Sequence, residues 1–494
     1  MANGLRREAF NQSSYDFWTG KYGVVNVKDF GAVGDGVHDD TAAIQAAVNA
    51  AAGNGPCLIG QQSDTFMIGK SVVVPNNSEL IINGTCIAAP AMNNTMFLMD
   101  ASTFNVVIRG NGILDGNKSA QTAPGPSQTN AIAVPNGSGV HHLTIRDITI
   151  QNCYNGPFNL VDVHDVLLDN LTLLDCGNAA GFAATSATTS YNCWAVNCHI
   201  SGLNDEGFAF YGGVFQSGIS NSLLHGQTSG SGISVLNDSS QTNPCHDITI
   251  ENNICYGNSM SGIECNSGQS IPVNNEGITI KNNIIFNNTL DGIQLGAAKS
   301  SLVAGNLSHD NNGGGIHLEN SSIFVNIVGN HIRNEGQGGT NGVGIEISSS
   351  SVTDILIENN MLFDDQSTKT MAYQLNGGGG SNIIARNNYL GPSIGQRNNL
   401  AVGAGNIFEG NHGYNPTGIQ TSPTIPAASA SIVNPFPYTV QVIVVGGAAV
   451  NIGIGNTSAT TATGLASGGV TLAAGQYINL GAYTTAPTWV WIGL

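Results

Sequence analysis

Basic residues are scarce in this chain of 494 residues. Lysine and arginine together number 14 against 32 aspartates and glutamates, so the formal net charge is −18 and only 9% of positions are charged. A strongly acidic protein is repelled by phosphate backbones and by anionic lipid surfaces. The composition therefore argues against a nucleic acid or a membrane surface as the partner.

Long apolar runs and a typical secretion signal are also missing. No segment approaches the roughly 20 apolar residues that a membrane span needs. Arg6 and Arg7 lie near the start, but no hydrophobic stretch follows them, so we do not expect a secretory signal here. The nine cysteines lack the CxxC or Cys/His spacing of a zinc site. Buried free thiols are the favoured interpretation of these cysteines, and a set of disulfides is the alternative.

Glycine, by contrast, is abundant, with 65 residues, and the middle of the chain repeats itself. Segments 246–265, 276–295 and 301–318 share a short β-branched strand, an asparagine, a second short strand, a polar turn and then Gly-Ile-x-aliphatic. The asparagine recurs at Asn170, Asn197, Asn221, Asn253, Asn283, Asn306, Asn330, Asn360, Asn388 and Asn411. The glycine recurs at Gly156, Gly181, Gly207, Gly232, Gly262, Gly292, Gly315 and Gly344. Two markers that keep phase over this length indicate a repeat architecture.

The repeat predicts a solenoid with three short strands in each turn. Successive turns of such a solenoid stack at about 4.8 Å, and inward residues such as Ile248 and Ile278 fill a narrow core. Asparagine suits the bend because it tolerates the left-handed backbone region, and stacked amides can form a hydrogen-bonded ladder. Helical repeats are excluded because the hydrophobic period within each unit is two residues.

Upstream of the repeats, residues 24–55 contain the one convincing helix signal. Alternating residues and a Gly-rich turn lead into Ala42–Ala52, which we expect to be helical, with Asp40 or Thr41 as the cap. A solenoid core is open at its first turn. The amphipathic helix is therefore predicted to cover that end.

Residues 30–36 (FGAVGDG) and 39–47 (DDTAAIQAA) resemble the entry signature of the pectate-lyase-like right-handed parallel β-helix superfamily. Polygalacturonases, alginate epimerases and phage tailspike depolymerases carry this signature. The resemblance implies an all-β fold, a right-handed parallel β-helix over residues 22–415 with an N-terminal capping helix. It also implies a polysaccharide as the substrate or ligand.

The C-terminal part of the chain has a different composition. From Ser422 to Leu494 there is no charged residue and no histidine. We expect a linker at 416–431 and a small β-sandwich of five short strands at 432–494. A surface without charge favours burial against copies of the same chain. The sandwich loosely resembles the C-terminal modules of trimeric tailspikes, so we predict an oligomerisation module and a homotrimer. A carbohydrate-binding module with Tyr483, Trp489 and Trp491 is the alternative.

Outward side chains of successive turns are expected to line up in rows. The row at position x is Ala183, Ala209, Ser234, Glu264, Gln294, His317 and Glu346. Two residues further along lie Thr185, Tyr211, Leu236, Asn266, Gly296, Glu319 and Ser348. The row before the glycine includes Ala180, Glu206, Ser231, Ser261, Asp291 and Gly314. This face therefore concentrates carboxylates and amides.

Hydrolysis of a glycosidic bond needs an acid and a base or nucleophile, usually two carboxyl groups. The predicted catalytic residues are Asp205, Glu206, Glu264 and Asp291. The predicted substrate-binding residues are Tyr211, Asn266, Gln294, His317, Glu319 and Glu346. Asp205-Glu206 and Asp291 resemble acidic positions of polygalacturonases, whereas the Arg-Ile-Lys element of that family has no match beyond Ile280-Lys281. Solvated surface carboxylates are the alternative interpretation of every acid in this set.

Cations are nearly absent where this face is predicted. Between Arg146 and Lys281 there is no lysine or arginine. A lyase or epimerase must neutralise the carboxylate of a uronate with cations or Ca²⁺. We therefore predict an extracellular or virion-surface polysaccharide depolymerase, a glycoside hydrolase without cofactor or metal. A phage tailspike with residues 1–21 as an N-terminal arm is one form that such a protein takes. A non-catalytic glycan-binding spike and a Ca²⁺-dependent polysaccharide lyase are the alternatives.

Overall fold

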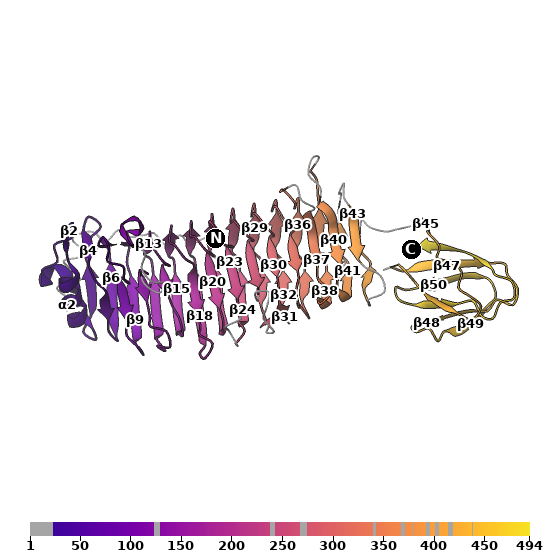
Figure 1. Ribbon diagram of the computed structural model, residues 1–494, viewed down its shortest axis with the longest axis horizontal. Coiled ribbons are helices and arrows are strands. Elements are labelled where there is room, and N and C mark those ends of the chain that lie inside the picture. The colour runs from indigo at the N-terminus through magenta and orange to yellow at the C-terminus, as the bar shows by residue number, and fades with distance from the viewer. Residues whose placement is uncertain are drawn as a thin grey trace. The chain divides into compact units, whose positions relative to one another are not determined.

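The computed structural model describes residues 23–122, 129–237, 243–266, 274–338, 342–366, 371–377, 379–391, 396–400, 405–412, 418–436 and 438–494. The predicted N-terminal arm lies outside these ranges. The chain divides into two compact units, Met1–Thr249 and Ile250–Leu494, which we describe one at a time. Short strands make up nearly all of the regular structure in both units (Figure 1).

In the first unit the chain coils through short parallel strands, and each coil adds one strand to each sheet (Figure 1). The first sheet contains β1 (Val25–Asn26), β3 (Pro56–Ile59), β6 (Ser78–Ile82), β9 (Phe104–Arg109), β12 (His141–Arg146), β15 (His164–Asp169), β18 (Ser190–Val196) and β21 (Val214–Ser220). The second contains β2 (Asp35–Asp39), β4 (Thr65–Ile68), β7 (Thr85–Ala88), β10 (Ile113–Asp115), β13 (Thr149–Gln151), β16 (Thr172–Leu174), β19 (His199–Ser201) and β22 (Leu223–His225). The third side is formed by β5 (Val72–Val74), β8 (Phe97–Met99), β11 (Ile132–Ala133) and β14 (Phe158–Asn159), and then by β17 (Ala180–Ala183), β20 (Phe208–Tyr211) and β23 (Ile233–Leu236).

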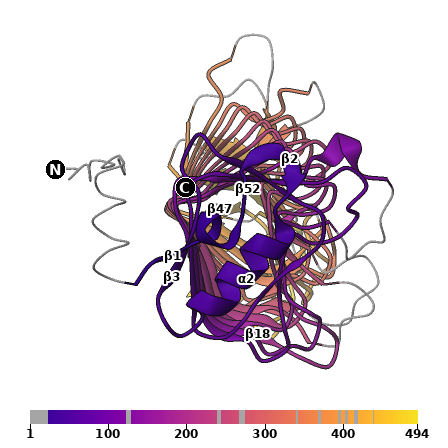
Figure 2. The ribbon, with the colours of Figure 1, turned by 90° about the vertical axis from the view of Figure 1, so that its left-hand side faces the viewer.

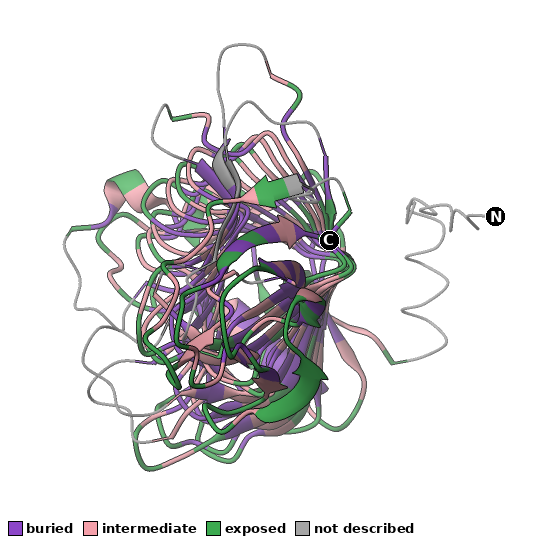
Figure 3. Ribbon diagram, turned by 90° about the vertical axis from the view of Figure 1, so that its right-hand side faces the viewer, coloured by how far each residue is buried: buried purple, intermediate pink, exposed green. Residues whose placement is uncertain are grey.

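Equivalent strands of the first unit pair in register, so side chains of successive coils stack. Leu143 pairs with Val166, which in turn pairs with Cys193, and all three are buried. Buried and partly exposed positions alternate along strands such as β4 and β7. Figure 3 colours each described residue by its burial. All nine cysteines of the sequence lie within the described residues and are buried free thiols, which confirms the favoured interpretation.

A single α-helix among the described residues covers the start of the first unit (Figure 2). The helix α2 (Thr41–Ala51) follows a short 3-10 turn, η1 (Val27–Phe30), and a second such turn, η2 (Lys118–Ala120), lies further along the chain. Ile44, Ala47 and Val48 are fully buried, and α2 contacts β1, β3, β5 and β6. The expected capping helix is therefore present at the predicted place.

Asp40, one of the two predicted caps, occupies the N-cap position of this helix. Asp40 precedes the helix, but its side chain makes no capping hydrogen bond. Its carboxylate instead accepts from the backbone N–H groups of Val33 and Gly34 at 2.7 and 3.1 Å. Asp39 Oδ1 accepts from the backbone N–H of Thr41 at 3.0 Å. The buried Asp40 therefore holds the Gly-rich turn in place, and Asp39 accepts a hydrogen bond from the first residue of the helix.

The second unit continues the same pattern with parallel strands in register. The strand β24 (His246–Glu251) contains the boundary between the units. The first sheet then contains β27 (Asn275–Glu276), β28 (Thr279–Lys281), β31 (Ala298–Lys299), β32 (Leu302–Ala304), β35 (Asn326–Val328), β38 (Thr353–Glu358), β41 (Ser381–Arg386) and β44 (Ile407–Glu409). The second contains β25 (Ile254–Tyr256), β29 (Ile284–Phe286), β33 (Leu307–His309), β36 (His331–Arg333), β39 (Met361–Phe363) and β42 (Tyr389–Leu390). The third contains β26 (Ile263–Asn266), β30 (Ile293–Leu295), β34 (Ile316–Leu318), β37 (Gly342–Ile347), β40 (Met371–Gly377) and β43 (Gln396–Leu400).

A row of buried asparagines runs through the second unit. The row is Asn253, Asn283, Asn306, Asn330, Asn360, Asn388 and Asn411. At each step the backbone N–H and the side-chain Nδ2 of one asparagine donate to Oδ1 of the next, as Asn283 does to Asn306 at 2.9 and 3.0 Å. The predicted ladder is confirmed for these residues.

The remaining asparagines of the predicted row occupy a different position. Asn170, Asn197 and Asn221 adopt the left-handed backbone with φ of 53°, 57° and 53°, as Asn252 and Asn282 do with φ of 57° and 56°. Asn252 and Asn282 lie one residue before a ladder asparagine. The bend and the ladder are therefore two neighbouring rows, and the predicted series mixed them because asparagine suits both.

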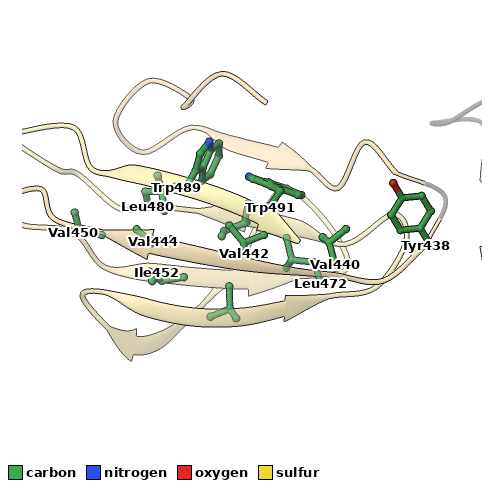
Figure 4. Packing of buried hydrophobic residues seen from close by; sticks show 12 residues of the cluster. Tyr438, Val440, Val442, Val444, Val450, Ile452, Leu472, Leu480, Trp489 and Trp491 are labelled. Atoms are coloured by element: carbon green, nitrogen blue, oxygen red, sulfur yellow. The ribbon is translucent and has the colours of Figure 1, made fainter. Parts of the chain in front are cut away.

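The end of the second unit is a β-sandwich with a packed apolar core. One antiparallel sheet contains β45 (Gly418–Gln420), β52 (Thr488–Gly493), β47 (Val440–Val445) and β50 (Gly468–Leu472). The other contains β46 (Ser431–Val433), β51 (Tyr477–Asn479), β48 (Ile452–Gly455) and β49 (Thr461–Leu465). Val440, Val442, Ile452 and Trp491 pack between them without exposure (Figure 4). The sheets begin with β45, inside the segment predicted as linker, and hold eight strands among the residues that the structure describes, where five were expected.

Candidate active site

A cleft in the first unit contains three of the predicted site residues. It measures about 310 Å³, and Asp205, Glu206 and Tyr211 line it together with residues from β14, β17, β20 and β23. The hollow arises where outward side chains are small, at Gly181, Ala183 and Ala209 along the two strands between the rims. Small side chains on an otherwise continuous face leave room for a ligand.

Gly181 lies where the backbones of two coils approach closely, and its pairing corrects one predicted row. Its φ is 151°, and a Cβ there would lie 2.0 Å from the carbonyl oxygen of Ala209, so no side chain fits. Gly181 pairs with Ala209, whereas Ala183 pairs with Tyr211. The predicted row placed Ala183 beside Ala209 and was wrong by two residues, because Gly181 was taken for the glycine that opens the strand.

Asp205 is a half-buried carboxyl group in the cleft. It lies just before β20, in the turn 204–207. Burial raises the pKa of Asp205 above the ordinary value of 3.8, against a smaller opposing effect from the backbone N–H of Glu206. Burial acts in this direction because it disfavours the charged form. Such a carboxyl group retains its proton to higher pH, as a general acid requires.

The neighbouring Glu206 is held firmly by donors from the next coil. Its Oε2 accepts from the backbone N–H of Ser231 and from the hydroxyl of Ser234, both at 2.6 Å. Both serines are fully buried. Hydrogen bonds to an ionised acceptor are short and strong. The two serines lie in the predicted outward rows, but a serine beside an acid has no distinctive sequence signal, so no function was predicted for them.

The predicted row at position x is confirmed in the second unit. Glu264 pairs with Gln294, Gln294 with His317 and His317 with Glu346 on consecutive strands. Gln294 donates from Nε2 to Oε1 of Glu319 at 3.0 Å. Glu264 is only 4% exposed, so the prediction that it lies on an open outward face is wrong. The side chain of Asn266 lies outside what the structure describes.

His317 connects two further side chains of this unit. Its Nδ1 lies 3.0 Å from Oδ2 of Asp291, and its Nε2 lies 2.8 Å from the hydroxyl of Ser348. Burial would lower the pKa of His317, but the hydrogen bond and charge of Asp291, with Glu346 and Glu319 nearby, raise it overall. The structure thus brings the predicted Asp291 and His317 into contact and adds Ser348, which sequence analysis did not select.

Two family models match the sequence of this chain. The model described as "Rhamnogalacturonase A/epimerase, pectate lyase-like" matches residues 24–236, and "Right handed beta helix region" matches residues 219–390. The resemblance to pectate-lyase-like proteins is therefore confirmed, and the fold is a right-handed parallel β-helix. In the described part of the chain, no helix is long and apolar enough to cross a membrane.

Particular relatives differ in what they do. Mannuronan C5-epimerase AlgE2 of Azotobacter vinelandii is 29% identical over 258 residues, which are 50% of this chain and 23% of that protein. Plasmin and fibronectin-binding protein A of Streptococcus pneumoniae is 29% identical over 175 residues, 30% of this chain and 24% of that protein. A variant tailspike protein of E. coli bacteriophage HK620 gives a TM-score of 0.57 at 14% identity, and the match covers 97% of this chain and 94% of the tailspike chain. These two curated matches span under a quarter of each relative, and the structural match establishes the fold.

Proposed function

We propose that this protein is a polysaccharide depolymerase that hydrolyses glycosidic bonds in the cleft of the first unit. The observation that carries the proposal is the pairing in one cleft of Asp205, whose pKa is raised by burial, with Glu206, which is fixed by two donors. Two carboxyl groups in different surroundings are what acid–base hydrolysis of a glycoside requires.

In this proposal the two carboxyl groups have separate roles. Asp205 holds a proton and gives it to the oxygen of the departing sugar. Glu206, oriented by its hydrogen bonds to Ser231 and Ser234, acts as the nucleophile or as the base that activates water. Tyr211 lies beside them and offers a ring and a hydroxyl to the sugar.

The charge of the cleft supports a neutral or weakly charged glycan. Among the residues that line it, all of them in the described chain, there is no lysine or arginine. A polyuronate such as mannuronan would bring one carboxylate per sugar next to Asp205 and Glu206. Like charges at such close range are unfavourable without a counterion. Hydrolysis is therefore proposed in preference to the epimerase reaction of the Azotobacter relatives or to a lyase reaction.

The proposed location is the cell exterior or a virion surface, and the proposed assembly is a homotrimer. Tailspike and surface-protein relatives support the location. The sandwich supports the assembly, because residues 422–494 contain no charge and such a surface favours contact with copies of itself. A homotrimer of this kind would present three clefts to a repetitive polymer.

The direct test is to incubate the full chain with a panel of neutral and acidic polysaccharides and to measure new reducing ends and product masses. Glu206→Gln and Asp205→Asn should each lower the rate by about 100-fold or more, because each removes an acid–base group. The matched control is Asp247→Asn in the same unit, whose side chain is 61% exposed and does not line the cleft; its rate should not change.

Two results would contradict the proposal. Retained binding without any chain cleavage would indicate a glycan-binding protein instead. An unsaturated product absorbing near 235 nm, lost on chelation, would indicate a lyase.

A further inference from the structure

Three side chains from consecutive coils of the second unit, none of them among the proposed glycosidase residues, are joined by hydrogen bonds. Asp291 lies before β30, His317 lies within β34 and Ser348 follows β37. Asp291 Oδ2 lies 3.0 Å from His317 Nδ1, and His317 Nε2 lies 2.8 Å from Ser348 Oγ. The two hydrogen bonds therefore connect a carboxylate, an imidazole and a hydroxyl in that order.

Each ring nitrogen has the partner that nucleophilic catalysis requires. A carboxylate at Nδ1 accepts the proton there and leaves the lone pair of Nε2 directed at the serine hydroxyl. Asp291 is itself oriented, because its Oδ1 accepts from the backbone N–H of Gly314 at 2.6 Å. This order of atoms matches a nucleophile, a base and an orienting acid.

The three side chains also become more exposed in the order Asp291, His317 and Ser348. The side chains of Asp291 and His317 are 14% and 17% exposed, whereas Ser348 is exposed. An exposed serine hydroxyl can bond to water, so its bond to histidine adds little to the stability of the fold. A shielded acid and base behind an accessible hydroxyl is the arrangement that a substrate can approach.

We propose that Ser348, His317 and Asp291 form a catalytic triad that hydrolyses carboxylic esters. The substrate class is an ester of a short carboxylic acid with an alcohol, such as an acyl group on a sugar hydroxyl. The sugar part of this assignment rests on the proposed function, whereas the ester chemistry does not. Acyl groups carried by a polysaccharide would then be removed by the same protein that cleaves its chain.

The reaction balances with water as the only co-reactant. Ser348 Oγ attacks the ester carbonyl carbon while His317 Nε2 takes the hydroxyl proton. The bond from the carbonyl carbon to the alcohol oxygen breaks, and His317 returns the proton to that oxygen, which leaves an acyl group on Ser348. Water then attacks this acyl group, His317 takes a proton from the water and returns it to Ser348, and the free acid departs.

The surroundings of His317 give the reaction a defined pH dependence. Asp291, Glu319 and Glu346 all face the ring and favour its protonated form. They stabilise the imidazolium that forms when Ser348 loses its proton, but only the neutral ring can start the reaction. Ester cleavage should therefore increase with pH through a pKa above the ordinary 6.5 of histidine.

The experiment uses the full chain with 4-nitrophenyl acetate as the ester and follows nitrophenolate release from pH 5 to 9. Ser348→Ala and His317→Ala should lower kcat/KM by about 1,000-fold, and Asp291→Asn should also lower it. The matched control is Ser350→Ala, an exposed serine of the same turn, which should keep the wild-type rate. A fluorophosphonate should label Ser348 alone, as peptide mass analysis would show.

The proposal is overturned if Ser348→Ala keeps the wild-type rate while its melting curve is unchanged, or if the fluorophosphonate labels another serine. Ester cleavage is measured by nitrophenolate and glycan cleavage by reducing ends. Either activity can therefore fail without the other.

Discussion

Glu335 is buried among polar partners at the end of a second row of amides, Asn258, Asn288 and Asn311. It accepts from the hydroxyl of Ser308 at 2.6 Å and from the backbone N–H of Asn311 at 2.9 Å. Burial nevertheless raises the pKa of Glu335 from 4.5 to about 8. At the scale of single residues, burial and hydrogen bonding thus compete, and at Glu335 and Asp205 burial dominates.

The raised pKa of Glu335 makes stability depend on pH. Between pH 4.5 and about 8 the folded chain holds a proton on Glu335 that the unfolded chain releases, so the free energy of unfolding falls as pH rises. The slope from this group is at most about 1.4 kcal/mol per pH unit. Glu335→Gln keeps one accepting oxygen for Asn311, replaces the other with an NH2 group that can donate to the Ser308 hydroxyl, and removes the titration. Urea unfolding at pH 5, 7 and 9 should show the variant less sensitive to pH than the wild type, and equal slopes would contradict this account.

At the scale of elements, the ladder of asparagines joins neighbouring coils. Asn306 accepts from the backbone N–H and Nδ2 of Asn283 and donates to the carbonyl oxygen of Ile280 and to Asn330. Its side chain lies in a buried row, where an unmet donor costs roughly 1–3 kcal/mol. Each ladder residue therefore satisfies donors and acceptors on more than one coil.

Asn306→Ala should destabilise the protein by about 3 kcal/mol, because two donors of Asn283 lose their acceptor in the interior. The matched control is Asn282→Gly. Asn282 is exposed and has φ of 56°, a conformation that glycine adopts without strain. Thermal unfolding should show a large loss for Asn306→Ala and little change for Asn282→Gly. Similar losses in both variants would show that the ladder is not the source of the stability.

The fold could be predicted from the sequence because both repeat markers report on the backbone. Glycine and asparagine mark positions where the chain must bend or where two coils approach closely, so their spacing predicts the number of residues in each coil. The details failed where one residue type suits two positions. Asparagine occurs both at the bend and in the ladder. Gly181 pairs with Ala209, so it belongs to the outward row itself and is not the glycine that opens the strand.

The candidate site was only partly predictable for a related reason. Register placed Glu264, Gln294, His317 and Glu346 in one row, because strands stack directly. Other features depend on side-chain direction and on contacts with neighbouring coils. These features are the burial of Glu264 and the hydrogen bonds made by Ser231, Ser234 and Ser348. Such three-dimensional contacts leave no periodic signal in a sequence, and serine is common in every outward row.

At the scale of the whole molecule, scarcity of charge defines both the partner and the assembly that we propose. Only 9% of the residues are charged, and residues 422–494 carry no charge, so much of the surface is uncharged. Such surfaces suit stacking and hydrogen bonding to sugars and contact between copies. The proposed glycosidase and esterase sites lie on different units of this scaffold, and each is tested by its own assay.

The most direct test of the central claim is a crystal structure of Glu206→Gln soaked with oligosaccharides released by the wild-type protein, or with fragments of whichever glycan it binds. The account predicts sugar density in the cleft, with a glycosidic oxygen within hydrogen-bonding distance of Asp205 and a ring beside Tyr211. Sugar bound only elsewhere on the chain, with this cleft holding solvent alone, would contradict it.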